Sequence, residues 1–153
     1  MMRKVWTTNA TGIAVLALGA ATAFAASPAD AVRTRHDGFH ELGAAFKNVN
    51  DELRGSAPQM VVLQISARQI KNVASQQYGW FPTGSGPQSG LKTKARAEIW
   101  SRAPAFKAAQ DALAQQANAF SQAVGTKDVA KIRVAAKALG GACAGCHKQF
   151  RTE

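Results

Sequence analysis

The chain has 153 residues, a formal net charge of +10 and two cysteines, and 46% of its residues are hydrophobic. It is long enough to bury one real core but too short for two domains. The basic residues are scattered rather than clustered, so they predict a solvated surface that steers acidic partners and no nucleic-acid binding.

The first 25 residues have the pattern of a cleaved export signal. Arg3 and Lys4 form a short basic region, residues 11–23 form an apolar run, and small residues at Ala23 and Ala25 favour cleavage before Ala26. The run is too short for a transmembrane helix, so we expect a periplasmic protein that is not membrane-embedded. A retained membrane anchor is the alternative. Removing 25 residues from 153 leaves one domain, residues 26–153, and lowers the formal charge to +8.

Apolar residues at spacings of three and four predict a bundle helix over 28–53. Ser27 is the expected N-cap, with Pro28 in the first turn. A second helix is expected over 58–78. Residues 79–103 then form a long irregular segment with five glycines or prolines between Pro82 and Gly90, a kind of segment that is often functional.

A third helix is expected from Pro104 to Gly125. The fourth is expected to open at Thr126 as N-cap, with Asp128 in its first turn. This helix contains Gly140-Gly141, which costs about 1 kcal/mol per glycine relative to alanine. Close approach to a flat cofactor, or a simple kink or packing contact, would explain the pair. Four such helices predict the all-α class and an antiparallel up-down four-helix bundle.

Cys143, Cys146 and His147 form a CxxCH motif near the C-terminus, which is typical of covalent haem c attachment. On a helix, offsets of three and four place the three side chains on one face. We interpret Cys143 and Cys146 as the covalent attachment points of one haem c, and His147 as an axial ligand of its iron. A redox dithiol would need a βαβ context, and a structural zinc site usually needs four ligands, so both alternatives are weaker.

With these motifs, residues 26–153 resemble the class II c-type cytochromes, the cytochrome c′ family. The resemblance rests on four features: CxxCH followed by Phe150-Arg151, Ala97-Glu98-Ile99-Trp100, the block from Trp80 to Pro87, and Arg35-x-x-x-Phe39-x-x-x-Gly43. It implies periplasmic electron transfer and binding of NO and CO. It also implies a homodimer through the first two helices, to which exposed Val61 and Ile65 would contribute. No acid–base constellation is predicted beside the iron, so we expect no enzyme activity.

The resemblance makes the sixth iron position the main functional question. The low-spin branch of class II carries a methionine ligand where this chain has Phe39, and phenylalanine has no lone pair to donate. We therefore expect a five-coordinate, high-spin haem with Phe39 and Leu42 in the distal pocket, which disfavours O₂ and tolerates NO and CO. The alternative is a six-coordinate, low-spin carrier with a ligand such as His36. Met60 is expected to be a core residue.

Further side chains are expected to contact the haem. Arg35 lies at a seam position, where it either pairs with a haem propionate or extends into solvent. By resemblance, Arg151 lies near the proximal side of the haem, and the alternative is that it only places a positive charge at the helix C-terminus. We expect the aromatic residues Trp80, Phe81 and Trp100 to wall the haem, unless they are ordinary core residues. The expected haem contacts are Arg35, His36, Trp80, Phe81, Trp100 and Arg151. Redox partner proteins would dock on the basic surface around the haem edge.

Overall fold

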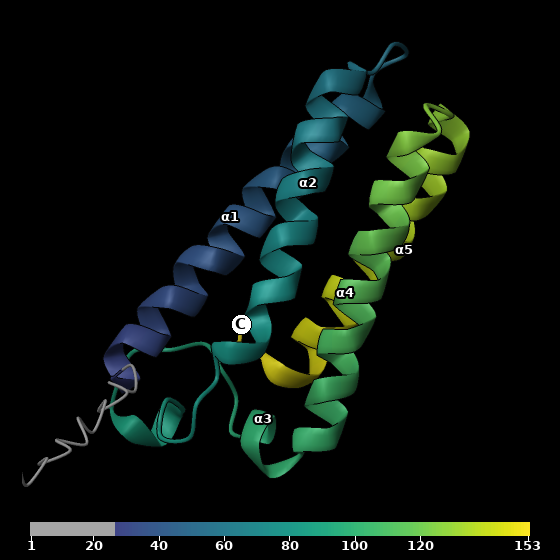
Figure 1. Cartoon of the computed structure of the whole chain (residues 1–153). Coiled ribbons are helices and arrows are strands. Elements are labelled where there is room, and N and C mark those ends of the chain that lie inside the picture. Colours follow the sequence, from purple (N-terminus) through teal and green to yellow (C-terminus); the bar gives the residue numbers. More distant parts are fainter. Residues whose placement is uncertain (1–26) are drawn as a thin grey trace, which may run out of the picture.

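The computed structural model describes residues 27–153 and consists mainly of four long helices (Figure 1). Helix α1 packs against α2, α2 against α4, α4 against α5, and α5 against α1. This closed order confirms the predicted all-α antiparallel four-helix bundle. The bounds of the long helices are α1 Pro28–Arg54, α2 Met60–Gln76, α4 Ala103–Gly125 and α5 Val129–Phe150.

The expected export signal, residues 1–25, lies outside the described residues. Among residues 27–153, no helix combines the length and the apolar character needed to cross a bilayer.

The ends of the first two helices follow local chemistry. The hydroxyl oxygen of Ser27 accepts a hydrogen bond from the backbone N–H of Asp30 at 3.1 Å, which confirms Ser27 as the N-cap of α1. Helix α2 is shorter than predicted, because it begins at Met60 and passes after Gln76 into one 3₁₀ turn, Gln77–Gly79.

The predicted start of the last helix is wrong by two residues. Thr126 caps the C-terminus of α4, where its hydroxyl donates to the carbonyl of Ala123. Lys127 has a left-handed backbone with φ of 59°, which is not a helical conformation. The helix that follows α4 can therefore start only after Lys127. Asp128 is the N-cap of α5, and its carboxylate accepts from the N–H groups of Ala130 and Lys131 at 3.0 and 3.1 Å.

The segment between α2 and α4 has more structure than its composition predicts. It contains the 3₁₀ turn Pro87–Ser89 and the four-residue helix α3, Glu98–Ser101. Ala95 and Arg151 form an isolated antiparallel bridge, and the N–H of Thr152 donates to the carbonyl of Lys94 at 2.9 Å. The segment is therefore tied to the end of α5, at the end of the bundle where the CxxCH motif lies.

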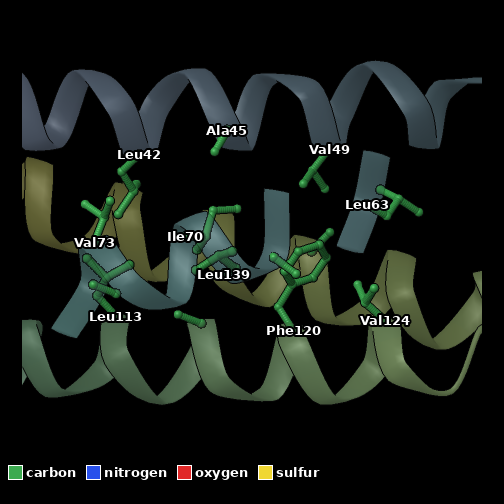
Figure 2. Packing of buried hydrophobic residues seen from close by; sticks show 14 of the residues in the cluster. Leu42, Ala45, Val49, Leu63, Ile70, Val73, Leu113, Phe120, Val124 and Leu139 are labelled. Atoms are coloured by element: carbon green, nitrogen blue, oxygen red, sulfur yellow. The ribbon is translucent and has the colours of Figure 1, made fainter. Parts of the chain in front are cut away.

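All four long helices contribute to one apolar core, seen from close by in Figure 2. Phe120, which is fully buried, lies among aliphatic side chains from the other helices. Burying each large apolar side chain stabilises the fold by about 1.5–3 kcal/mol relative to leaving it exposed. Met60 packs on this core, as expected for a gap-filling residue. Val61 and Ile65 on α2 are 59% and 52% exposed, as predicted.

Candidate haem-attachment site

The CxxCH motif lies in the last two turns of α5. Cys143 and Cys146 are both half-buried. Cys143 packs against the main core, whereas Cys146 packs against a second apolar cluster formed by Ile99, Phe106 and Phe150. The motif therefore lies where the two clusters meet, with both thiols directed into apolar surroundings.

The electrostatics of the motif differ from those of a redox dithiol. Burial raises the pKa of both thiols, and the negative charge of a Cys143 thiolate raises that of Cys146 further. Reactive dithiols instead have lowered pKa values, commonly at a helix N-terminus, whereas these cysteines lie near the C-terminal end of α5. The pKa of His147 is lowered by partial burial and by the positive charge of Arg151, which favours the neutral imidazole that a metal requires.

The chemistry of these side chains fits a covalently attached haem. Two thiols on one helical face offer two covalent bonds, and the adjacent imidazole offers one ligand. Within residues 27–153, no group of three or more histidine, cysteine or acidic side chains is arranged to hold a bare metal ion.

Helix α5 runs without a break through the glycine pair before the motif. A Cβ at Gly140 would lie 3.3 Å from Cζ of Phe46, whereas one at Gly141 would meet open space. Helix packing therefore explains Gly140, and the space beside Gly141 leaves room for close approach of another group.

A layer of aromatic rings links α1 to the end of α5. The rings of Phe39 and Trp80 meet edge to face with centroids 5.1 Å apart, and the Phe39 and Phe81 centroids are 6.2 Å apart. The ring centroids of Phe81 and Phe106 are 4.8 Å apart, and those of Phe106 and Phe150 are 5.1 Å apart. Phe81 packs on both apolar clusters, so it joins the Phe39 side of the bundle to the cluster that holds Cys146.

Arg35 is only 4% exposed, so the solvent-exposed alternative for this side chain is wrong. Its guanidinium donates to the hydroxyl and carbonyl oxygens of Ser85 at 2.9 and 2.6 Å, and to the hydroxyl of Thr93 at 2.7 Å. It also lies 5.2 Å from the ring centroid of Phe81, within the range of a cation–π contact. Arg35 thus fixes the segment between α2 and α4 against α1.

Comparison with known proteins decides the family. The family model described as Cytochrome C' matches residues 30–151. The chain belongs to the cytochrome c′ family. Cytochrome c′ from Pararhodospirillum photometricum is 34% identical over 127 residues, which cover 82% of this chain and 99% of that protein.

Solved structures of the family have the same bundle. Cytochrome c′ from Rubrivivax gelatinosus has a TM-score of 0.76 at 31% identity, covering 82% of this chain and 97% of that one. A nitric oxide complex of a cytochrome c prime variant from Alcaligenes xylosoxidans has a TM-score of 0.75 at 27% identity, covering 84% of this chain and 98% of that one. Members of the cytochrome c′ family carry one covalently attached haem c with iron, and the family binds NO and CO.

The other predicted contact residues of this chain lie in different surroundings. Leu42 is buried in the main core, and Trp80 is also buried. Trp100 is half-buried, and its indole N–H donates to the carbonyl of Phe81 at 3.2 Å. Arg151 is exposed at the end of α5. The His36 side chain is 71% exposed and bonds to the carboxylate of Asp37 at 3.0 Å.

Sequence reasoning missed several residues that shape the site. Ser85 and Thr93 lie 50 and 58 residues after Arg35 in the chain. No local sequence pattern therefore predicts that they bind its guanidinium. Phe106 lies in α4 and Phe150 at the end of α5, so their contact depends on how the two helices pack. A buried serine in a glycine- and proline-rich segment has no sequence signal that separates it from an ordinary turn residue.

Proposed function

We propose that residues 26–153 form a periplasmic haem c protein with a five-coordinate iron, which binds NO or CO and transfers electrons. The pattern of the first 25 residues favours export, and covalent haem c attachment is expected outside the bacterial cytoplasm. The nitric oxide complex of the Alcaligenes xylosoxidans relative supports gas binding at such a site.

The observation that carries the proposal is the aromatic layer around Phe39. Phe39 contacts Trp80 and Phe81, and none of the three side chains offers iron a lone pair in the manner of methionine or histidine. Met60, the only methionine after residue 26, packs at the start of α2. His36 is mostly exposed and already bonds to Asp37. The surroundings therefore favour an open sixth position.

When bound, haem c supplies an iron that takes a diatomic ligand and exchanges one electron. The chain's own residues hold and shield it. Cys143 and Cys146 fix its position covalently, and His147 presents a neutral imidazole. Phe39 and Leu42 exclude water and offer no hydrogen-bond donor, which disfavours O₂ relative to NO and CO. Arg35 holds the segment that carries Trp80 and Phe81, so these rings stay in place.

Exposed cationic side chains lie near the end of α5 and support docking of acidic redox partners. The carbonyl of Lys94 accepts a hydrogen bond from the N–H of Thr152, which holds Lys94 beside the C-terminal residues. Lys148 and Arg151, which are close to Thr152 in sequence, are also exposed. Their charge would steer an acidic protein toward this end of the bundle. Exposed Val61 and Ile65 support a homodimer through α1 and α2. Sedimentation of the haem-loaded protein tests the dimer.

The decisive test is the absorption spectrum of the reduced, haem-loaded protein with and without CO or NO. We expect a high-spin spectrum that changes on adding either gas. A six-coordinate, low-spin spectrum that CO leaves unaltered would contradict the open site. His36→Gln is expected to leave the spectrum unchanged, since the proposal assigns no iron ligation to His36.

Substitution by methionine gives a matched pair of variants. Phe39→Met is expected to move the spectrum toward low spin, because its thioether can reach an iron that faces position 39. Phe46→Met makes the same chemical change two turns further along α1, where the side chain packs against Gly140. It is expected to remain high-spin. An equal response of both variants would mean that Phe39 does not face the iron.

A further inference from the structure

Two histidines lie side by side on the solvent-facing surface of α1. His36 and His40 are four residues apart, so they occupy neighbouring positions on one face of the helix. Their ring centroids are 5.5 Å apart and their ring planes are inclined by 38°. Both residues are exposed, so an ion in solution can reach both rings.

The separation of the rings matches a shared metal ion. Imidazole nitrogens bind Zn²⁺ at about 2.0–2.1 Å, so two imidazoles on one tetrahedral ion have ring centres about 5 Å apart. The observed 5.5 Å lies within a small side-chain rotation of that distance. The helix backbone places both residues on one face, so binding requires no rearrangement of the fold.

Asp37 prepares one of these rings for coordination. Its carboxylate lies 3.0 Å from Nδ1 of His36. A histidine that donates one ring N–H to a carboxylate presents its other nitrogen to a metal with a fixed tautomer and raised basicity. This arrangement leaves Nε2 of His36 as the coordinating atom.

The local charge also favours a cation, although the protein as a whole is basic. Asp37 and Glu41 each follow one of the histidines directly, and Glu41 is held by the amide of Gln69 at 3.0 Å. Arg33 lies one turn before His36, and its guanidinium pairs with Asp30.

We propose that His36 and His40 form a surface binding site for a divalent transition-metal ion, separate from the haem. Two imidazoles bind the ion and water fills its remaining positions. Because imidazole affinity follows the Irving–Williams order, Cu²⁺ is bound most tightly and Zn²⁺ and Ni²⁺ more weakly.

The test is equilibrium dialysis of the ferric, haem-loaded protein against Cu²⁺ or Zn²⁺, with the bound metal measured by atomic emission. We expect one ion per chain, and Cu²⁺ bound more tightly than Zn²⁺. Outer-shell partners of metal ligands are typically worth about 10- to 100-fold in affinity, so losing a ligand through His36→Gln or His40→Gln costs at least that much. Asp37→Asn keeps both ligands and is expected to weaken binding by about tenfold.

A spacing variant separates chelation from a general effect of histidine content. Glu41→His in the His40→Gln background keeps two histidines but places them five residues apart, on different faces of the helix. We expect it to bind as weakly as His40→Gln alone. Wild-type affinity in either single variant, or recovery in the spacing variant, would overturn the proposal. A haem spectrum altered by His36→Gln would also overturn it, by placing His36 at the iron.

Discussion

Replacing Gly38 with alanine is expected to destabilise the protein, although alanine is the better helix former. Gly38 lies in α1 against the indole of Trp80. A Cβ at this position would lie 2.1 Å from Cη2 of Trp80 and within 2.7 Å of two further ring carbons. Carbon atoms in ordinary contact are about 3.5–4.0 Å apart, so the ring would have to move by more than an ångström.

The size of the effect follows from two opposing contributions. Alanine gains about 1 kcal/mol over glycine in a helix interior. Overpacking in a core costs about 1–3 kcal/mol, and occasionally more. Trp80 is 7% exposed and meets Phe39 edge to face, so the indole has little space to yield. Since three ring atoms overlap, we expect the upper end of that cost and a net loss of about 2 kcal/mol, or about 4–8 °C in Tm.

Guanidinium unfolding of the haem-loaded protein measures this loss. Ala44→Gly, at an exposed position of the same helix, calibrates the propensity contribution and should cost about 1 kcal/mol. Trp80→Leu removes the indole, so Gly38→Ala in that background should lose most of its penalty. The coupling between the two sites is expected within the range of about 0.5–3 kcal/mol found for contacting residues.

A Gly38→Ala variant as stable as the parent protein would refute the reasoning. So would an equal effect of Gly38→Ala with and without Trp80→Leu, because the penalty would then not come from the indole.

Three further predictions follow from single contacts. Arg35→Met is expected to lower the unfolding free energy by at least about 2 kcal/mol in guanidinium titrations, because the loop oxygens lose a buried charged donor. Asp128→Ala should lower Tm at pH 7, whereas Asp128→Asn should largely retain it. Hydrogen bonding from the backbone N–H of Lys131 lowers the pKa of Asp128. The Tm difference between the parent protein and Asp128→Ala is therefore complete above about pH 4 and shrinks as pH falls through the lowered pKa. Trp100→Phe should speed amide exchange in residues 80–97, because its indole N–H no longer holds the Phe81 carbonyl.

Local chemistry made much of the fold predictable. The spacing of apolar residues placed the four long helices to within a few residues, and Ser27 and Pro28 marked the start of α1 correctly. The start of α5 was misplaced because both Thr126 and Asp128 are good N-cap residues. Only the left-handed backbone of Lys127 separates the two, and that conformation has no strong signal in a lysine.

The segment between α2 and α4 was the least predictable part. Its glycines and prolines indicate turns but not their partners. The segment is held by Arg35 from α1 and by the C-terminal residues after α5, which are distant in sequence. Such contacts depend on how the helices assemble, and no periodic pattern records them.

The sequence by itself determined the cofactor class and the likeness to the cytochrome c′ family, because covalent haem attachment needs two thiols and an imidazole at fixed helical offsets. The tertiary structure decided what surrounds that motif. It buried Arg35 against Ser85 and Thr93, joined Phe39 to Phe150 through a chain of aromatic contacts, and left His36 beside His40 in solvent. These arrangements follow from the packing of segments far apart in the chain, whereas the haem motif is complete within five consecutive residues.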